Sequence, residues 1–254
     1  GRGFSPAEYA CFGRDMADSR ALTEEALAIL RLAFHGAPVS FTGRHFTLDN
    51  VDIVPKVIQQ PHPPLWSAAV SPESFERAAR QGVGVLIGPF KPWFMIKEDI
   101  RRYREHWRRH HGDGPTAPGQ NPRVGMTLGI FCLEDAERAR ALAREGLTWA
   151  YRALFKQTLP VLEKLYAGYE YYRRLGSLRG LIGKAITLPA LETLGMAVVG
   201  DPPHCIRRLE ALHAAGVDHV LCTVGGGVLP TEQVRESLRV LGERVLPHFR
   251  EPPP

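Results

Sequence analysis

Residues 61–74 of this chain read PHPPLWSAAVSPES, and this stretch decides how the chain folds. Its first four residues cannot propagate a helix, because three of them are prolines. Leu65–Val70 follows and is apolar except for Ser67, as expected of a parallel strand buried on both faces. Ser71 is a favourable helix N-cap, and Pro72 stands where proline is best tolerated, at the first helical position. The stretch therefore predicts a short buried strand that turns directly into a helix.

The turn into this helix also predicts a binding site for an anion. The first turn of a helix has free backbone N–H groups, and the hydroxyls of Ser71 and Ser74 are expected beside them. The N–H groups and the positive end of the helix dipole attract negative charge, so the expected ligand is a phosphate. The alternative is a capped helix that binds only water, and the local sequence leaves both interpretations open.

Strands and helices alternate along the rest of the chain. Apolar runs predict four strands, at 65–70, 83–87, 124–132 and 219–224. The long helical segments between them indicate a parallel sheet with right-handed crossovers. A length of 254 residues suits a (β/α)8 barrel, but such a barrel needs eight strands, so a doubly wound sheet is the competing fold. No G-x-G-x-x-G motif follows a strand, which weakens a dinucleotide-binding interpretation.

Glycine and proline punctuation sets the expected bounds of the helices. The predicted helices include 72–81, about 93–110, 134 to about 148, and 231–247. The first of them ends at Gly82, a favourable residue just past a helix C-terminus. Residues 150–196 contain several tyrosines and no clear strand, and they predict a helical insertion. Residues 39–54 alternate weakly and predict a small hairpin.

Composition limits the class of protein. The chain is 44% hydrophobic and 23% charged, which is ordinary for a soluble globular protein, and no apolar run reaches the ~18 residues of a membrane span. The four cysteines lack the close spacing of a zinc site, so they predict reduced thiols in a cytoplasmic protein. They are Cys11, Cys132, Cys205 and Cys222.

The net charge of +5 has a local source in the arginines of 101–109. Glu98, Asp99 and Glu105 interrupt this run, and the arginines fall around the helix, so we expect a solvated helix face and no nucleic-acid partner. The neighbouring pair His110-His111 has no carboxylate or cysteine at ligand spacing, and no metal site is predicted there.

Short motifs along the chain, taken in their order and spacing, resemble the bacterial luciferase-like flavin monooxygenase family. In the N-terminal part these are Gly1-Arg2-Gly3, Phe12-Gly13-Arg14-Asp15, Ser19-Arg20, Glu24-Glu25, residues 39–46, Val54-Pro55-Lys56 and Pro64-Leu65-Trp66. In the C-terminal part they are Val199-Gly200-Asp201-Pro202, residues 215–218, Ser237-Leu238 and Val245-Leu246-Pro247. The resemblance covers nearly the whole chain and is least clear at 150–196.

The resemblance implies an α/β fold of the (β/α)8 barrel family. Gly1-Arg2-Gly3 would follow the fourth barrel strand, so we expect a single domain over 1–254 that supplies strands five to eight of an incomplete barrel. The helical insertion at 150–196 would cap the pocket at the carboxyl ends of the strands.

The resemblance also implies a site for the flavin phosphate. Arg2 and Arg20 fall where the family has arginines near this phosphate, and Ser71 and Ser74 match its hydroxyl positions, with the backbone of Val70 and Ser71 beside them. Luciferase has an acidic residue where this chain has Val70, which leaves only N–H contacts there. From local sequence alone, Arg2 would be a frayed chain end and Arg20 would pair with Glu24 four residues later.

The activity implied by the resemblance is that of a monooxygenase that uses reduced FMN and O2 on a small organic substrate. A flavin reductase is an expected partner, and a homo-oligomer, namely a dimer, is the expected assembly. The alternatives are an F420-dependent oxidoreductase of the same superfamily and a non-catalytic flavin-binding relative or inactive fragment. No catalytic residue is assigned, because His45, His62 and His204 stand in positions typical of structural histidines.

Overall fold

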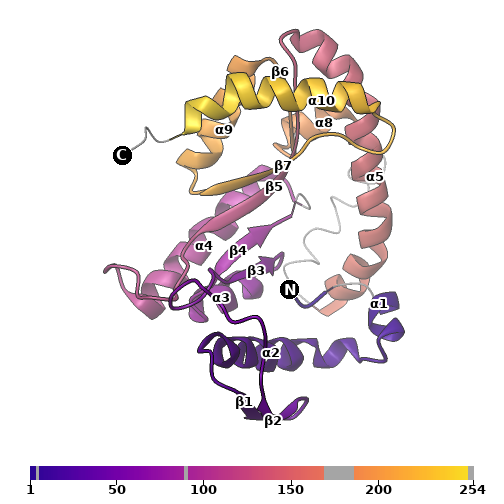
Figure 1. Ribbon diagram of the computed structural model, residues 1–254. Helices are drawn as coiled ribbons and strands as arrows, with labels where there is room; N and C mark the ends of the chain where they lie inside the picture. The colour runs from indigo at the N-terminus through magenta and orange to yellow at the C-terminus, as the bar shows by residue number, and fades with distance from the viewer. Residues whose placement is uncertain (4–5, 89–90, 169–185, 251–254) are drawn as a thin grey trace. The chain divides into compact units, whose positions relative to one another are not determined.

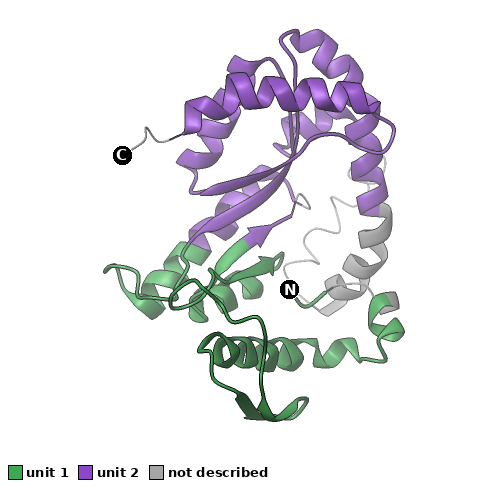
Figure 2. Cartoon of the chain, in the orientation of Figure 1, with its two compact units in different colours: residues 1–85, 103–122 green, residues 86–102, 123–254 purple. Residues whose placement is uncertain are grey.

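The computed structural model describes residues 1–3, 6–88, 91–168 and 186–250, and for 6–7 and 156–168 it describes the backbone alone. The chain divides into two compact units, coloured separately in Figure 2. Unit 1 comprises 1–85 and 103–122, and unit 2 comprises 86–102 and 123–254. The division falls inside strand β4 (Gly84–Ile87) and inside helix α4 (Trp93–His111).

Unit 1 carries the stretch from which the fold was predicted. In chain order its elements are α1 (Pro6–Cys11), a 3-10 turn (Met16–Asp18), α2 (Ser19–Phe34), β1 (Val39–Thr42), β2 (Thr47–Val51), β3 (Trp66–Ala69) and α3 (Pro72–Arg80), all labelled in Figure 1 except the 3-10 turn. The predicted hairpin is confirmed as the antiparallel pair β1–β2. Glu25 of α2 anchors this hairpin. Its carboxylate accepts hydrogen bonds from the N–H groups of Arg44, His45 and Phe46 at 2.9–3.1 Å.

The strand and helix predicted from residues 61–74 both form, but the expected burial of the strand on both faces is wrong. Of Trp66–Ala69 only Ala69 is buried and Ala68 is exposed, because β3 is the terminal strand in the order β3-β4-β5-β6 of the described sheet. Ser71 is the N-cap residue of α3 and Pro72 its first helical residue. The helix ends at the C-cap Gln81, and Gly82 follows with a φ of 69°, a left-handed conformation that glycine adopts without strain. β3 pairs with β4, and the N–H of Gly84 donates to the carbonyl of Leu65 at 3.0 Å.

A polar brace inside unit 1 fixes the start of both strands. The hydroxyl of Tyr103, which is fully buried, donates to the carbonyl of Val83 at 2.9 Å. The Asn121 side-chain amide donates to the carbonyl of Leu65 at 3.0 Å. Phe75 and Ala79 of α3 are also fully buried, so one face of this helix packs into the core of unit 1. The position of the turn at Ser71 is therefore set from both ends of the strand–helix segment.

Unit 2 holds the remaining parallel strands. Its elements after α4 are β5 (Val124–Cys132), α5 (Ala136–Gly168), α8 (Leu188–Thr193), β6 (Ala197–Gly200), α9 (Pro202–Ala214), β7 (His219–Thr223), α10 (Thr231–Val240), a π-helical turn (Leu241–Val245) and a 3-10 turn (Leu246–Phe249). β5 pairs in parallel with β6 along its second half and with β7 along its first half. The predicted strands at 124–132 and 219–224 are thus confirmed within a residue.

Helix α5 corrects one prediction. It was expected to end near Thr148, but it continues without a break to Gly168. The reason is a buried stripe at helical spacing, Leu147, Tyr151 and Phe155, which packs in the core of unit 2. The hydroxyl of Tyr151 donates to the carbonyl of Met196 and ties α5 to the residue before β6. The predicted insertion therefore begins as an extension of α5, and its residues 169–185 lie outside the described part of the chain.

Two smaller expectations also need correction. Strand β6 was not predicted, because its four residues are too short a run to stand out beside the N-cap Asp201 that follows it. The last helix, expected to reach Pro247, is α-helical only to Val240. Gly242 and the missing N–H of Pro247 disfavour regular α-helix beyond Val240.

Among the described helices, none combines the length and apolar character needed to span a membrane.

Candidate functional site

The two serines of the turn between β3 and α3 have different surroundings. The Ser74 side chain is buried, and its hydroxyl accepts from the N–H of Val70 at 3.0 Å and donates to the carbonyl of Ser71 at 2.5 Å. Ser71 is half-buried, and its side chain makes no capping hydrogen bond to the helix. Ser74 therefore closes the turn, whereas the hydroxyl of Ser71 is left for another group.

Arg2 is held beside β3. A Cβ placed on Gly1 would lie 3.1 Å from the Cβ of Ala68, so the backbone before Arg2 passes close to the end of this strand. The carbonyl of Arg2 accepts a hydrogen bond from the Tyr9 hydroxyl, and Gly3 turns the chain with a φ of 76°. These contacts fix the segment that carries Arg2.

Arg20 lies in the first turn of α2 and is exposed to solvent. The alternative interpretation of this residue, an ion pair with Glu24, is not found among the ion pairs of the described residues. The charges of Arg20 and Glu24 nevertheless both act on Arg77 of α3, and so does the charge of Arg2.

Arg77 of α3 was not among the residues predicted from the sequence. Only 8% of this residue is exposed, although it carries a full charge. Burial lowers the pKa of its guanidinium, the positive charges of Arg2 and Arg20 lower it further, and Glu24 acts in the opposite direction. A signal for it was present in the sequence, since Arg77 falls between Ser74 and Ala78 on the face of α3 that packs inward.

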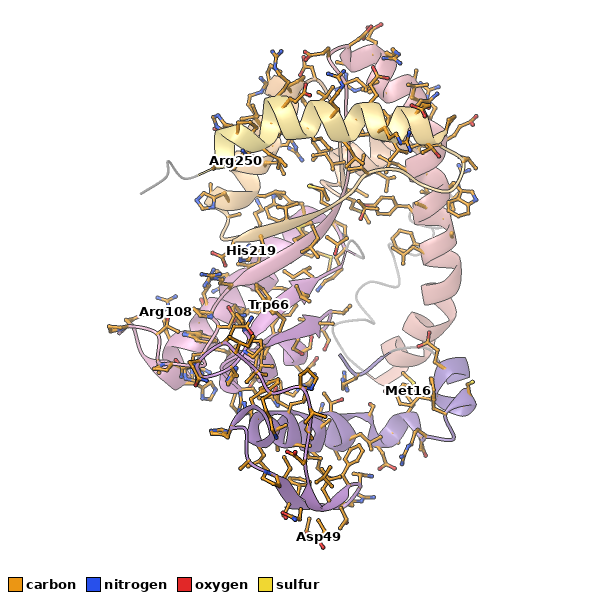
Figure 3. The ribbon with its side chains drawn as sticks, in the orientation of Figure 1. Met16, Asp49, Trp66, Arg108, His219 and Arg250 are labelled. Atoms are coloured by element: carbon orange, nitrogen blue, oxygen red, sulfur yellow. The ribbon has the colours of Figure 1, made fainter. Side chains whose placement is uncertain are left out.

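Arg77 and Arg2 line the same cavity of about 510 Å³ inside unit 1. Trp66 and Ser67 of β3 and Tyr9 of α1 also line it; Trp66 is labelled in Figure 3. The apolar part of its wall comes from α2, through Leu22, Ala26, Leu27 and Leu30. Arg14 lines it as well, so the cavity joins a mainly apolar wall to three arginines.

The histidines considered as acids or bases occupy supporting positions. His62 Nδ1 lies 2.8 Å from the carbonyl oxygen of Pro63, and its ring packs against Phe34 with 5.4 Å between ring centres. His45 lies 4.0 Å from a carboxylate oxygen of Asp18. Burial is the main cause that lowers the pKa of His204, which sits in the first turn of α9. In the described residues, no group of three or more histidine, cysteine or acidic side chains is placed to hold a metal ion.

Comparison with known proteins adds a family match. The family model described as luciferase-like monooxygenase matches residues 1–219. The uncharacterized protein y4wF of Sinorhizobium fredii is 29% identical over 235 residues, which cover 91% of this chain and 62% of that protein. The alkanal monooxygenase alpha chain of Photobacterium leiognathi is 24% identical over 258 residues, covering 99% and 70% of the two chains. The chain thus spans under two thirds of the first relative's length.

Solved structures of similar fold include three oxidoreductases. Monooxygenase RslO1 of Streptomyces bottropensis superposes with a TM-score of 0.73 at 22% identity, over 98% of this chain and 68% of that one. The oxygenating constituent of 3,6-diketocamphane monooxygenase of Pseudomonas putida, in complex with FMN, superposes with a TM-score of 0.65 at 14% identity. The match covers 100% of this chain and 71% of that one. The coenzyme F420 dependent tetrahydromethanopterin reductase of Methanopyrus kandleri superposes with a TM-score of 0.60 at 18% identity. The match covers 93% of this chain and 65% of that one. These likenesses place the fold with the luciferase-like TIM-barrel proteins.

Proposed function

Because the chain belongs to the luciferase-like monooxygenase family, we propose that it holds the phosphate of FMN in a flavin-dependent monooxygenase. The substrates would be O2 and a small organic molecule. A flavin reductase that supplies reduced FMN, and a second copy of the chain in a homodimer, are the partners we propose with it.

One observation carries this proposal, the positive charge of Arg2 and Arg20 that acts on α3. Arg2 lies beside the end of β3, and both Arg2 and Arg20 act electrostatically on the helix that this turn starts. A guanidinium offers a planar pair of donors that matches two phosphate oxygens. The Ser71 hydroxyl and the N-terminus of α3 would add neutral donors to the same anion. These residue types fit a phosphate ester.

In this proposal the chain's own residues bind, orient and shield. Arg2, Arg20 and Ser71 would hold the phosphate, and the hydrogen bonds of Ser74 keep the turn in the conformation that presents Ser71. The apolar wall from α2 would exclude water beside the site. When bound, the reduced flavin supplies the oxygen chemistry, as cofactors do in such enzymes. No residue of this chain is proposed as a general acid or base.

Titration with FMN tests the phosphate assignment. We expect Arg20→Ala and Ser71→Ala each to raise the Kd for FMN by about tenfold, since each removes a hydrogen bond to a charged group. Arg109→Ala, which removes an exposed arginine of α4 in the same unit, is the matched control and should leave the Kd unchanged. An unaltered affinity in the Arg20 and Ser71 variants would overturn the assignment.

The cofactor itself is tested by a second experiment. The fold is shared with an FMN complex and with an F420-dependent reductase, so both cofactors are compared directly. We expect O2 consumption with reduced FMN and none of the hydride transfer that an F420-dependent oxidoreductase would show. Hydride transfer to or from F420 without O2 consumption would contradict the proposal and favour that alternative.

A further inference from the structure

A buried arginine of unit 1 lacks a direct counter-ion. Arg77 is 8% exposed, and within the described residues its guanidinium has neither a hydrogen bond nor an ion pair within 4 Å. Buried arginines are almost always paired, because an uncompensated charge in a protein interior costs several kcal/mol. Arg77 thus departs from the usual behaviour of its residue type.

The charges around Arg77 increase this departure. Arg2, Arg20 and Arg80 act on it with the same sign, and the one opposing charge that acts on it among the described residues is that of Glu24. These groups come from the N-terminal segment, from α2 and from α3 itself. A cluster of positive charge held together by packing is stabilised by an anion, which supplies the missing counter-charge.

Arg77 is also placed where an anion can reach it. It stands one helical turn beyond Ser74 on the buried face of α3, and the charges of Arg2 and Arg20 act on it. It lines the cavity together with Arg2, Trp66 and Ser67. The N-terminus of α3 alone would not establish a site, but the buried Arg77 that shares this cavity with Arg2 is an independent feature.

We propose that Arg77 is a third arginine of the phosphate site, a binding residue that pairs with the phosphate group. The inference rests on the proposed function and deepens it. It makes the site selective for a doubly charged phosphate monoester, since arginines outnumber carboxylates there: Arg2, Arg14 and Arg77 line the cavity with Glu8. A flavin without a phosphate would gain nothing from Arg77.

Comparing FMN with riboflavin isolates the contribution of the phosphate. The Kd for each ligand is measured for the wild-type protein, Arg77→Gln, Arg77→Lys and the control Arg109→Gln, which changes an exposed arginine of α4 in the same unit. We expect Arg77→Gln to weaken the binding of FMN by about tenfold and to leave the binding of riboflavin unchanged. Arg77→Lys should recover part of the loss, and Arg109→Gln should match the wild type. If Arg77→Gln weakens the binding of FMN and of riboflavin equally, Arg77 acts through packing and the inference is wrong.

Inorganic phosphate separates this inference from the proposed function. We expect phosphate to raise the melting temperature of the wild-type protein in a concentration-dependent way, and to raise that of Arg77→Gln much less. If neither flavin binds the wild type but phosphate still stabilises it through Arg77, the flavin proposal fails and the anion role of Arg77 stands. If phosphate stabilises both proteins equally, or neither, the role of Arg77 is overturned.

Discussion

The two units each bury a cationic side chain, and they treat its charge in opposite ways. In unit 2, Lys91 is 4% exposed and forms an ion pair with Asp99, which is 1% exposed. In unit 1, Arg77 is buried to a similar degree but has arginines as neighbours and no ion pair among the described residues. The charge of Lys91 is compensated within its own unit, whereas the charge of Arg77 stays uncompensated until an anion binds, as our proposal requires.

The electrostatics of the lysine pair agree with a structural role. Burial raises the pKa of the Asp99 carboxyl, although the charge and hydrogen bond of Lys91 act in the opposite direction. The carboxyl is therefore held at some cost, which the lysine offsets from within the same unit. At Arg77 the charge of Glu24 acts in that direction, but no ion pair is formed within the described part of the chain, which is why we assign the remaining counter-charge to a bound anion.

The largest effect is expected from breaking the buried pair. Lys91→Met leaves Asp99 buried without its partner and should lower the free energy of unfolding by about 3–5 kcal/mol. Lys91→Met combined with Asp99→Leu removes both charges and should recover most of the loss. Urea denaturation measures both variants. A double variant as unstable as the single one would show that the pair is not a self-contained charge pair, and the comparison with Arg77 would fail.

A smaller loss is expected at the turn beside Arg77. Ser74→Ala removes the hydroxyl that bonds to Val70 and Ser71, and it should cost about 1–2 kcal/mol of stability. Ser71→Ala should cost little stability, because the Ser71 side chain makes no capping hydrogen bond, but it should weaken the binding of FMN. Thermal melts and FMN titrations of both variants distinguish the two serines. The reverse pattern would contradict their assigned roles.

Arg77 itself should behave unlike Lys91. Because Arg77→Met removes a repelled charge and keeps a long apolar stem, we expect the ligand-free variant to gain about 1 kcal/mol of stability. Phosphate should stabilise this variant less than the wild type. Urea denaturation without phosphate measures the stability of the ligand-free variant, and urea denaturation with phosphate measures how much phosphate stabilises it. A loss of several kcal/mol without phosphate would mean that Arg77 has a counter-charge within the folded chain.

An exposed ion pair provides the baseline for both buried cations. Hydrogen bonds from Arg101 and Arg102 lower the pKa of Glu98 to about 2, from 4.5. Its contribution is therefore present above pH 4.5 and is lost as the pH falls to about 2. Since these side chains are largely solvated, Glu98→Gln should cost only about 0.5 kcal/mol at pH 7, and nothing at the acid end of that range. Unfolding at both pH values checks this; a loss that persists in acid would contradict it.

The sequence was sufficient to predict the segment that positions the site. Residues 65–82 carry local signals that agree, an apolar run, a proline at the first helical position and a glycine just past the helix end. The continuation of α5 was missed, because it depends on Tyr151 and Phe155 packing against residues near 186–199, far along the chain. Local composition contains no record of such long-range contacts.

Arg77 was missed for a related reason. A lone arginine in a helix is solvated by default, and this expectation outweighed the position of Arg77 between Ser74 and Ala78 on the inward face of α3. The N-terminal segment and α2, which lie far from Arg77 in the sequence, line a cavity together with it. Arg2 and Arg20 could be assigned from motif order, but the burial of Arg77 became apparent only from the packing.

The central claim is that the arginines of unit 1 and Ser71 hold a flavin phosphate, and a crystal structure of the protein with FMN tests it most directly. We predict that phosphate oxygens lie within about 3 Å of the Ser71 hydroxyl and of the guanidinium groups of Arg2, Arg20 and Arg77. A bound FMN whose phosphate lies elsewhere, or points into solvent away from Ser71, would contradict the account.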